Sequence, residues 1–129
     1  MAKLPTPRPT DAELAILRVL WRNGPSTVRQ VQQALSQDRP TGYTTALKLL
    51  QIMTQKSLVQ RDQDERRHVY RARYSEAQTQ RQLVGDLLER AFGGSRTKLV
   101  MQALAAKKAS PKELAELRRL LDELEGGAQ

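Results

Sequence analysis

The sequence predicts a mainly α-helical protein in which three helices, a β-hairpin and three further helices follow one another along 129 residues. Three observations support this fold class. Apolar residues recur at intervals of three and four, as they do on the buried face of a helix. Polar and apolar residues alternate only in one short basic segment near the middle of the chain. Gly and Pro interrupt the helical patterns at the places where helices end.

The first helix is predicted to begin after Thr10. Residues 1–9 contain three prolines and read as a flexible tail. Thr10 and Glu13 have the spacing of a capping box, in which each side chain satisfies a backbone amide at the helix start. Asn23-Gly24-Pro25 ends the helix. We expect Trp21 to fill the core rather than to stack on a ligand. The apolar stripe consists of Leu14, Leu17, Leu20 and Trp21.

Two more helices complete the N-terminal group. Ser26-Thr27 reads as a short extended piece that caps a second helix, whose buried edge is Val28, Val31 and Leu35, with Arg29 and Gln32 facing outward. A loop that ends at Pro40 leads into the third helix. This helix is predicted within residues 41–56, with its cap near Thr41-Gly42. The apolar side of this third helix consists of Ala46, Leu49, Leu50 and Met53.

The opposite side of the third helix is polar and carries no acid. It consists of Thr44, Lys48, Gln51 and Gln55. A face that only keeps a helix in solution usually mixes acids with bases. Hydroxyl, amide and ammonium groups suit phosphate oxygens and base edges. This face therefore indicates a nucleic-acid surface, although short polar faces without acids also occur on ordinary helices.

A basic hairpin is predicted next. The segments 57–62 and 67–74 are rich in β-forming residues, and side chains alternate along the second one. Three short helices with tight turns, followed by a hairpin, form a winged helix-turn-helix. Arg66 and Arg67 lie near the tip of this wing, where they are placed to reach a minor groove. The alternative is that these arginines only keep an edge strand in solution.

Residues 75–129 are predicted to form a three-helix dimerisation domain, and residues 10–74 the winged-helix domain. Ser75 and Ser110 begin capping boxes, and Gly93-Gly94 separates the first two of these helices. Helices this short cannot all bury their apolar sides within ~55 residues, so we expect a homodimer. The middle helix is expected to bury Leu99, Val100, Ala103 and Leu104. The expected interface residues are Leu87, Leu88, Phe92, Leu99, Val100, Leu114, Leu117, Leu121 and Leu124.

The charge of the chain is concentrated in its N-terminal part. Residues 1–75 hold 13 Lys or Arg against 6 Asp or Glu, and residues 76–129 hold 9 against 8, which accounts for the net charge of +8. The N-terminal part is therefore suited to a polyanion. The absence of cysteine from the sequence excludes disulfides and thiolate metal sites. Without a signal peptide or a long apolar run, we expect a cytoplasmic protein.

The sequence offers little support for catalysis. The single histidine, His68, is expected to be an ordinary strand residue rather than a general base. Asp62, Asp64 and Glu65 cluster near a turn, where acids are common and neighbouring arginines neutralise them. No Gly-rich phosphate loop or nucleophile motif occurs in the sequence. We therefore expect no enzymatic activity, no cofactor and no metal.

Six segments, taken together, resemble the penicillinase-repressor family, which includes the BlaI, MecI and CopY repressors. They are AELAILRVLWRNGPSTVRQV, YTTALKLLQIMTQKSLVQRD, HVYRA, FGGS, LVMQAL and SPKELAELRRLLDEL, and they span nearly the whole chain in the order of the family. The resemblance implies a repressor that binds palindromic operator DNA as a homodimer, with its recognition helix in the major groove. By position, Thr44, Thr45 and Lys48 would read bases, and further candidate contacts are Tyr43, Gln51 and Arg29.

The chain also departs from the family pattern. Members often carry a basic residue where this chain has Leu47, and many have Gly-Arg where it has Glu65-Arg66. Some members are cleaved at an Asn–Phe bond through a membrane sensor-protease system, but Gln102-Ala103 stands at that place here, which puts this partner in doubt. The C-terminal cysteines of copper-responsive members are absent. A winged helix that docks proteins or binds RNA is the alternative function, because fold does not fix function.

Overall fold

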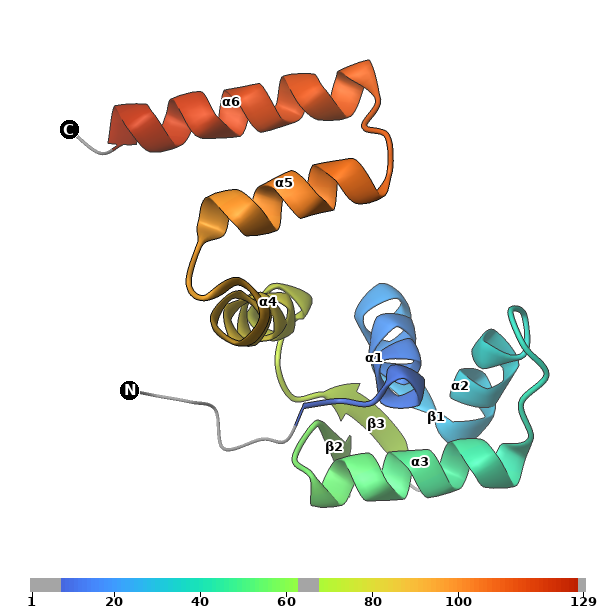
Figure 1. Cartoon of the computed structure of the whole chain (residues 1–129). Helices are drawn as coiled ribbons and strands as arrows, with labels where there is room; N and C mark the ends of the chain where they lie inside the picture. Colours follow the sequence, from blue (N-terminus) through green and yellow to red (C-terminus); the bar gives the residue numbers. More distant parts are fainter. Residues whose placement is uncertain (1–7, 63–67, 128–129) are drawn as a thin grey trace. The chain divides into compact units, whose positions relative to one another are not determined.

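The computed structural model describes residues 8–62 and 68–127 (Figure 1). The predicted wing-tip residues Arg66 and Arg67, their acidic neighbours Asp64 and Glu65, and tail residues 1–7 lie outside the described residues. The predicted mainly α-helical fold is confirmed. The elements follow in the order α1 (Asp11–Asn23), β1 (Ser26–Thr27), α2 (Val28–Leu35), α3 (Tyr43–Gln55), β2 (Val59–Asp62), β3 (Val69–Ala72), α4 (Glu76–Phe92), α5 (Arg96–Ala106) and α6 (Pro111–Gly127).

The chain divides into two compact units, one up to Gly85 and one from Asp86 onward. The sequence placed a domain boundary after Tyr74, because Ser75 begins a capping box. The helix does start there, since the Ser75 amide donates to Gln78 Oε1 at 2.9 Å and the Gln78 amide donates to Ser75 Oγ at 3.1 Å. However, α4 runs unbroken across the division. A capping box marks where a helix begins, which is not necessarily where a compact unit ends.

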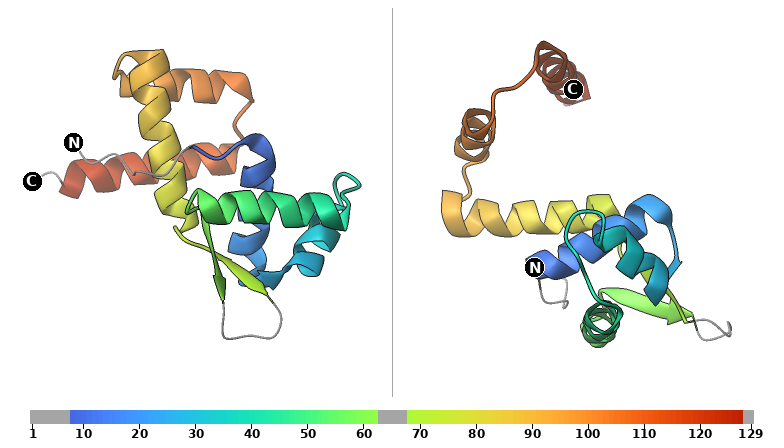
Figure 2. Two further views of the ribbon diagram at one scale, coloured as in Figure 1. Left: turned by 90° about the horizontal axis from the view of Figure 1, so that it is seen from below. Right: turned by 90° about the vertical axis from the view of Figure 1, so that its right-hand side faces the viewer.

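The first unit contains a winged helix-turn-helix, in which α1, α2 and α3 gather around a small antiparallel sheet (Figures 1 and 2). The sheet has the order β1-β3-β2. The predicted hairpin is confirmed by the pairing of β2 with β3. The extended piece before α2 also joins this sheet, with Ser26 opposite Tyr70 and Thr27 opposite Val69. The start of α2 is therefore held against the wing.

Local capping signals set the helix starts in the first unit. Thr10 caps α1, and the Thr10 amide donates to Glu13 Oε1 at 2.9 Å. Thr27 caps α2 in the same way, with its amide donating to Gln30 Oε1 at 2.9 Å. In contrast, α3 begins after Gly42 without a side-chain cap. The start of α3 must therefore be fixed by tertiary contacts.

The core of the first unit lies between the three helices and the sheet. Ala46, Leu50 and Met53 on α3 are fully buried, and Leu49 is partly buried against them, so the predicted apolar side is confirmed. The predicted stripe of α1 was incomplete. The Trp21 indole donates from Nε1 to the carbonyl of Tyr74 at 3.0 Å, and its ring packs against the core as expected. The buried residues of the α1 stripe are Ile16, Leu17, Val19 and Leu20, whereas Leu14 and Trp21 are partly buried.

A buried ion pair joins the start of α1 to the end of α3. Lys56 Nζ donates to both carboxylate oxygens of Glu13 at 2.9 Å. The Glu13 side chain is 2% exposed and that of Lys56 is 27% exposed. Glu13 Oε1 also accepts the amide of Thr10. One carboxylate therefore caps α1 and fixes the last turn of α3, a long-range contact that the capping motif alone does not predict.

The second unit buries much less apolar surface. Neither α5 nor α6 contains a buried residue among those described. The expectation that α5 buries its apolar residues is wrong for the single chain, because Leu99 is only partly buried and Val100, Ala103 and Leu104 are exposed. Helical periodicity identifies an apolar face but not the element that covers it. In the part of the chain that the structure describes, no helix is both long and apolar enough to cross a membrane.

Candidate nucleic-acid interface

The polar face of α3 points away from the core. Thr44, Thr45, Lys48, Gln51 and Gln55 are all exposed. The residues on the other side of α3 are buried, so the helix cannot rotate without exposing its apolar side chains. The predicted orientation of this face is confirmed, and its polar groups are free to reach a ligand.

Hydrogen bonds from α2 fix the loop that leads into α3. Gln32 Nε2 and Ser36 Oγ each donate to the carbonyl of Thr41 at 3.0 Å, and the Thr41 amide donates to Ser36 Oγ at 3.2 Å. The prediction that Gln32 faces outward is wrong, since its side chain is partly buried in this network. These contacts take the place of a side-chain cap and set the position of the first turn of α3.

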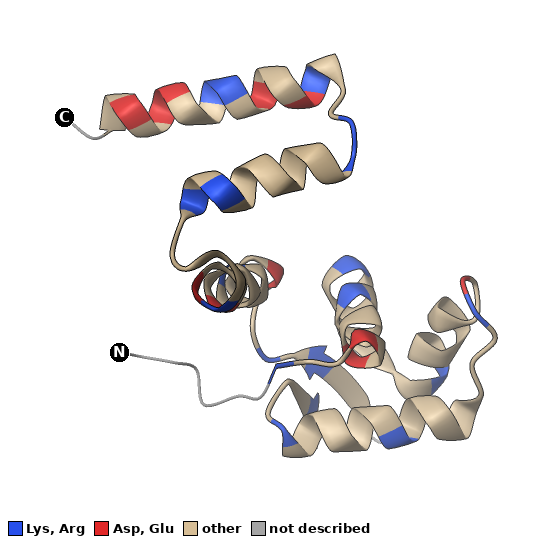
Figure 3. Cartoon of the chain, in the orientation of Figure 1, with Lys and Arg blue, Asp and Glu red and all other residues tan. Residues whose placement is uncertain are grey.

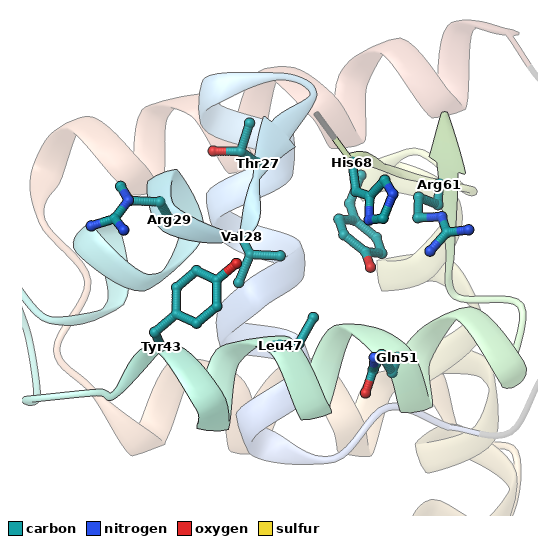
Figure 4. Close-up of a pocket in the computed structure, with 9 residues that line it drawn as sticks. Thr27, Val28, Arg29, Tyr43, Leu47, Gln51, Arg61 and His68 are labelled. Carbon is teal, nitrogen blue, oxygen red and sulfur yellow. The ribbon is translucent and has the colours of Figure 1, made fainter. Parts of the chain in front are cut away.

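A groove of about 640 Å³ lies between the start of α2, the outer face of α3 and the hairpin. Figure 4 shows Tyr43 and Leu47 extending from α3 into this space, with Val28 beside them and with His68 and Arg61 on the hairpin side. The groove is open, as a surface that receives a macromolecule must be. Its lining residues are Thr27, Val28, Arg29, Tyr43, Leu47, Gln51, Arg61, His68 and Tyr70.

Of the predicted DNA contacts that lie among the described residues, Arg29, Tyr43 and Gln51 line this groove. The Arg29 guanidinium lies 5.8 Å from the centre of the Tyr43 ring, a cation–π distance that links α2 to the start of α3. Thr44, Thr45 and Lys48 are exposed on the neighbouring part of the same helix. The structure therefore brings the candidate contacts of α2 and α3 to one surface.

The hairpin was expected to contribute through its tip, but its strand residues that line this groove were not among the predicted contacts. Arg61 and Tyr70 are neighbours in the β2–β3 register and both line the groove, together with the exposed His68. The alternation of the second segment identified a strand but not the element that it faces. The pairing of β1 with β3 brings the start of α2 to this hairpin, and such a long-range pairing leaves no local signal.

The charge of this surface is positive. No Asp or Glu occurs in the sequence between Asp38 and Asp62. Asp62 itself forms an ion pair with Arg71 at 3.5 Å across the hairpin. Figure 3 shows basic residues on α2, α3 and the hairpin, whereas α6 carries both signs. The surface is therefore suited to a polyanion, because no described acid among the groove residues repels phosphate.

The predicted dimerisation residues lie in the second unit, and most are exposed. The leucines of α6 increase in exposure along the helix, from 38% for Leu117 to 62% for Leu124. Met101 and Leu120, which the sequence analysis did not select, are 61% and 51% exposed. Of the predicted residues, Leu87, Val100, Leu117, Leu121 and Leu124 are exposed, and Leu88, Phe92, Leu99 and Leu114 are partly buried.

Comparisons with known proteins agree with the resemblance seen in the sequence. The family model described as penicillinase repressor matches residues 9–123. The transcriptional regulators BlaI of two strains of Mycobacterium tuberculosis are each 38% identical to the chain over 129 residues, which covers 98% of this chain and 91% of theirs.

Two solved structures are also similar. One is the solution structure of the monomeric form of Bacillus licheniformis BlaI in complex with the blaP half-operator, which is 24% identical, covers 56% of this chain and 88% of its own, and has a TM-score of 0.49. The other is a probable transcriptional regulator from Pseudomonas aeruginosa, 25% identical over 90% of this chain and 78% of its own, with a TM-score of 0.44. The match over residues 9–123 and the 38% identity to the BlaI regulators show that the chain belongs to the penicillinase repressor family, whose members are non-enzymatic, DNA-binding transcriptional repressors.

Proposed function

We propose that the chain binds palindromic promoter DNA as a homodimer, with α3 in the major groove and the hairpin near the minor groove. The observation that carries this proposal is the exposed face of α3, which is free of acids and borders a groove lined by arginines from α2 and β2. An α-helix fits the major groove of B-form DNA, where base edges present their donors and acceptors.

The candidate contacts on α2 and α3 divide into two roles. Lys48, Thr44 and Thr45 are exposed and offer donors to base edges. Arg29 and Tyr43 lie at the edge of the groove and are suited to phosphate oxygens, which fix the register of the protein on the duplex without reading sequence. Gln51 lies further along α3, also lines the groove, and is able to bond to a base through its side-chain amide. For Arg66 and Arg67, a minor-groove contact stays a proposal from the sequence.

The homodimer is proposed on the exposed apolar residues of the second unit. Leu121 and Leu124 are 61% and 62% exposed on α6, and Val100 is 49% exposed on α5. Exposed apolar groups at this density are usually covered by a partner, and a second copy of the same face is the simplest cover. Two recognition helices then reach half-sites about one helical turn apart, ~34 Å. Linking the half-sites raises affinity through effective concentration.

Release of DNA is proposed to follow from separation of the two copies. Gln102 and Ala103, at the place of the family cleavage site, are both exposed on α5. A signal that separates or cuts the C-terminal helices removes the gain from linked half-sites, and the reading surface in the first unit stays intact. The family resemblance suggests a sensor protease for this step, but Gln102-Ala103 stands where the cleaved members have Asn–Phe, which argues against that partner here.

The experiment is a competition binding assay with the full chain. Fluorescence anisotropy would compare its own promoter fragment, a random duplex and a structured RNA, and footprinting would locate the protected bases. We expect preference for the promoter and a symmetric protected tract. For variants that remove one positive charge from the proposed surface, such as Lys48→Ala, the control is Lys107→Ala, in the exposed loop after α5. Equal binding of all three polymers, or preference for RNA, would overturn the proposal.

A further inference from the structure

We propose that Leu47 contacts the methyl group of a thymine in each half-site and so determines part of the base specificity. The inference rests on the proposed binding of α3 in the major groove. It goes further because it assigns one base type to one apolar side chain. Its support comes from the position of Leu47 on α3, from its surroundings in the groove and from the chemistry of base edges.

Leu47 is the aliphatic residue that α3 contributes to the groove. It lies four residues after Tyr43 and four before Gln51, so the three form one row along α3, and all three line the groove. Exposed Thr44 and Lys48 flank this row. Figure 4 shows Leu47 extending from α3 into the space between Val28 on one side and His68 on the other. A base edge that meets Thr44 or Lys48 therefore has an apolar side chain beside it.

The inner part of Leu47 packs against the core, and its outer part borders the groove. It is partly buried and contacts the core cluster, while Val28 extends the apolar surface on the α2 side. Neither side chain offers a hydrogen-bond partner. A polar base edge placed here would lose its bonds to water without replacement. In the major groove, thymine alone presents a methyl group, whereas cytosine presents an amino donor at the neighbouring position.

The charges around the groove favour a nucleic acid over an apolar peptide as its occupant. Figure 4 shows Arg29 on α2 and Arg61 on β2 on opposite sides of Leu47. None of the described residues that line the groove is acidic. Cations on two sides with an apolar residue between them match two phosphate backbones that enclose a base edge.

The test uses the full chain and DNA in which only methyl groups change. Binding sites would first be selected from a random duplex pool, and each thymine of the selected site would then be replaced by uracil. We expect one thymine per half-site whose replacement weakens binding about fourfold, which is the effect of one methyl-sized group of ~0.8 kcal/mol. In Leu47→Ala, the same replacement should have no effect. Leu49→Ala, on the core side of α3, should keep the fourfold effect.

Leu47→Lys is a second variant that keeps an aliphatic stem against the core if Leu47→Ala does not fold. It should change the selected base from thymine to guanine, whose O6 and N7 accept from an ammonium group. The inference is overturned if uracil is tolerated at every thymine, if the methyl effect persists in Leu47→Ala, or if Leu47→Lys still selects thymine. A pool that yields no enriched sequence would instead refute the proposed function itself.

Discussion

Removing the Lys56 ammonium should destabilise the first unit strongly, because it leaves the Glu13 carboxylate buried and charged. The Glu13 side chain is 2% exposed, and Oε2 has Lys56 Nζ at 2.9 Å as its partner, whereas Oε1 keeps the Thr10 amide. Breaking a buried pair by removing one partner typically costs ~3–5 kcal/mol. Since 27% of the Lys56 side chain is exposed, water reaches the site, and we expect about 2–3 kcal/mol.

The assay is thermal unfolding of Lys56→Met, followed by circular dichroism at one fixed protein concentration, because association shifts the apparent stability. A loss of ~2–3 kcal/mol corresponds to a decrease in Tm of roughly 8–24 °C for a unit of this size. The double variant Glu13→Gln with Lys56→Met should recover part of this loss, since a neutral amide is cheaper to bury than a lone carboxylate. Lys98→Met, at an exposed position of α5, is the control and should lie within ~0.5 kcal/mol of wild type.

The result that would refute this reasoning is a Tm of Lys56→Met equal to that of the control variant. It would mean that the pair behaves as a surface salt bridge, whose contribution is often ~0–1 kcal/mol. A double variant no more stable than Lys56→Met would also contradict the reasoning, because the cost would then come from the missing packing of the lysine stem. Neither side chain borders the groove, so DNA preference should be unchanged wherever the variants are folded.

Three further outcomes follow from the proposed DNA complex. Lys48→Ala should weaken operator binding by ~1–3 kcal/mol and random duplex much less, as measured by anisotropy; an equal effect on both would make it a phosphate contact. Arg66→Ala with Arg67→Ala should reduce the slope of the logarithm of the binding constant against the logarithm of the salt concentration, by about 0.9 for each phosphate that is no longer neutralised. An unchanged slope would show that the wing does not contact DNA. Leu117→Asp with Leu121→Asp should give monomers in sedimentation and abolish tight operator binding; a variant that stays dimeric would place the interface elsewhere.

The sequence predicted well what local chemistry determines. Four helices in the structure begin after a Ser or Thr that is followed three residues later by Glu or Gln, namely after Thr10, Thr27, Ser75 and Ser110. This spacing is a local signal, because the two side chains satisfy backbone amides of the same turn. The side of α3 that is buried follows from periodicity in the same way. The starts of these helices and the apolar side of α3 were therefore predictable before the fold was known.

What the sequence did not predict depends on contacts between distant residues. The salt bridge from Glu13 to Lys56 joins residues 43 apart, and the groove requires the pairing of β1 with β3. Leu47 was noted only as a departure from a family pattern, because its neighbours across the groove come from α2 and the hairpin. Helical periodicity predicted that Gln32 faces outward, yet its side-chain amide donates a hydrogen bond to the carbonyl of Thr41. Tertiary hydrogen bonds here override the helical pattern.

These contacts also predict that the proposed separation of the two copies would release DNA without altering the proposed base contacts of α3. The orientation of α3 is set by Gln32 and Ser36 at its start, by Lys56 at its end, and by its buried residues between them. All of these contacts lie within the first unit, which extends only to Gly85. Separation of the C-terminal helices breaks none of them. The released chain should therefore keep its base preference, and its affinity should fall because two half-sites are no longer bound by one linked molecule.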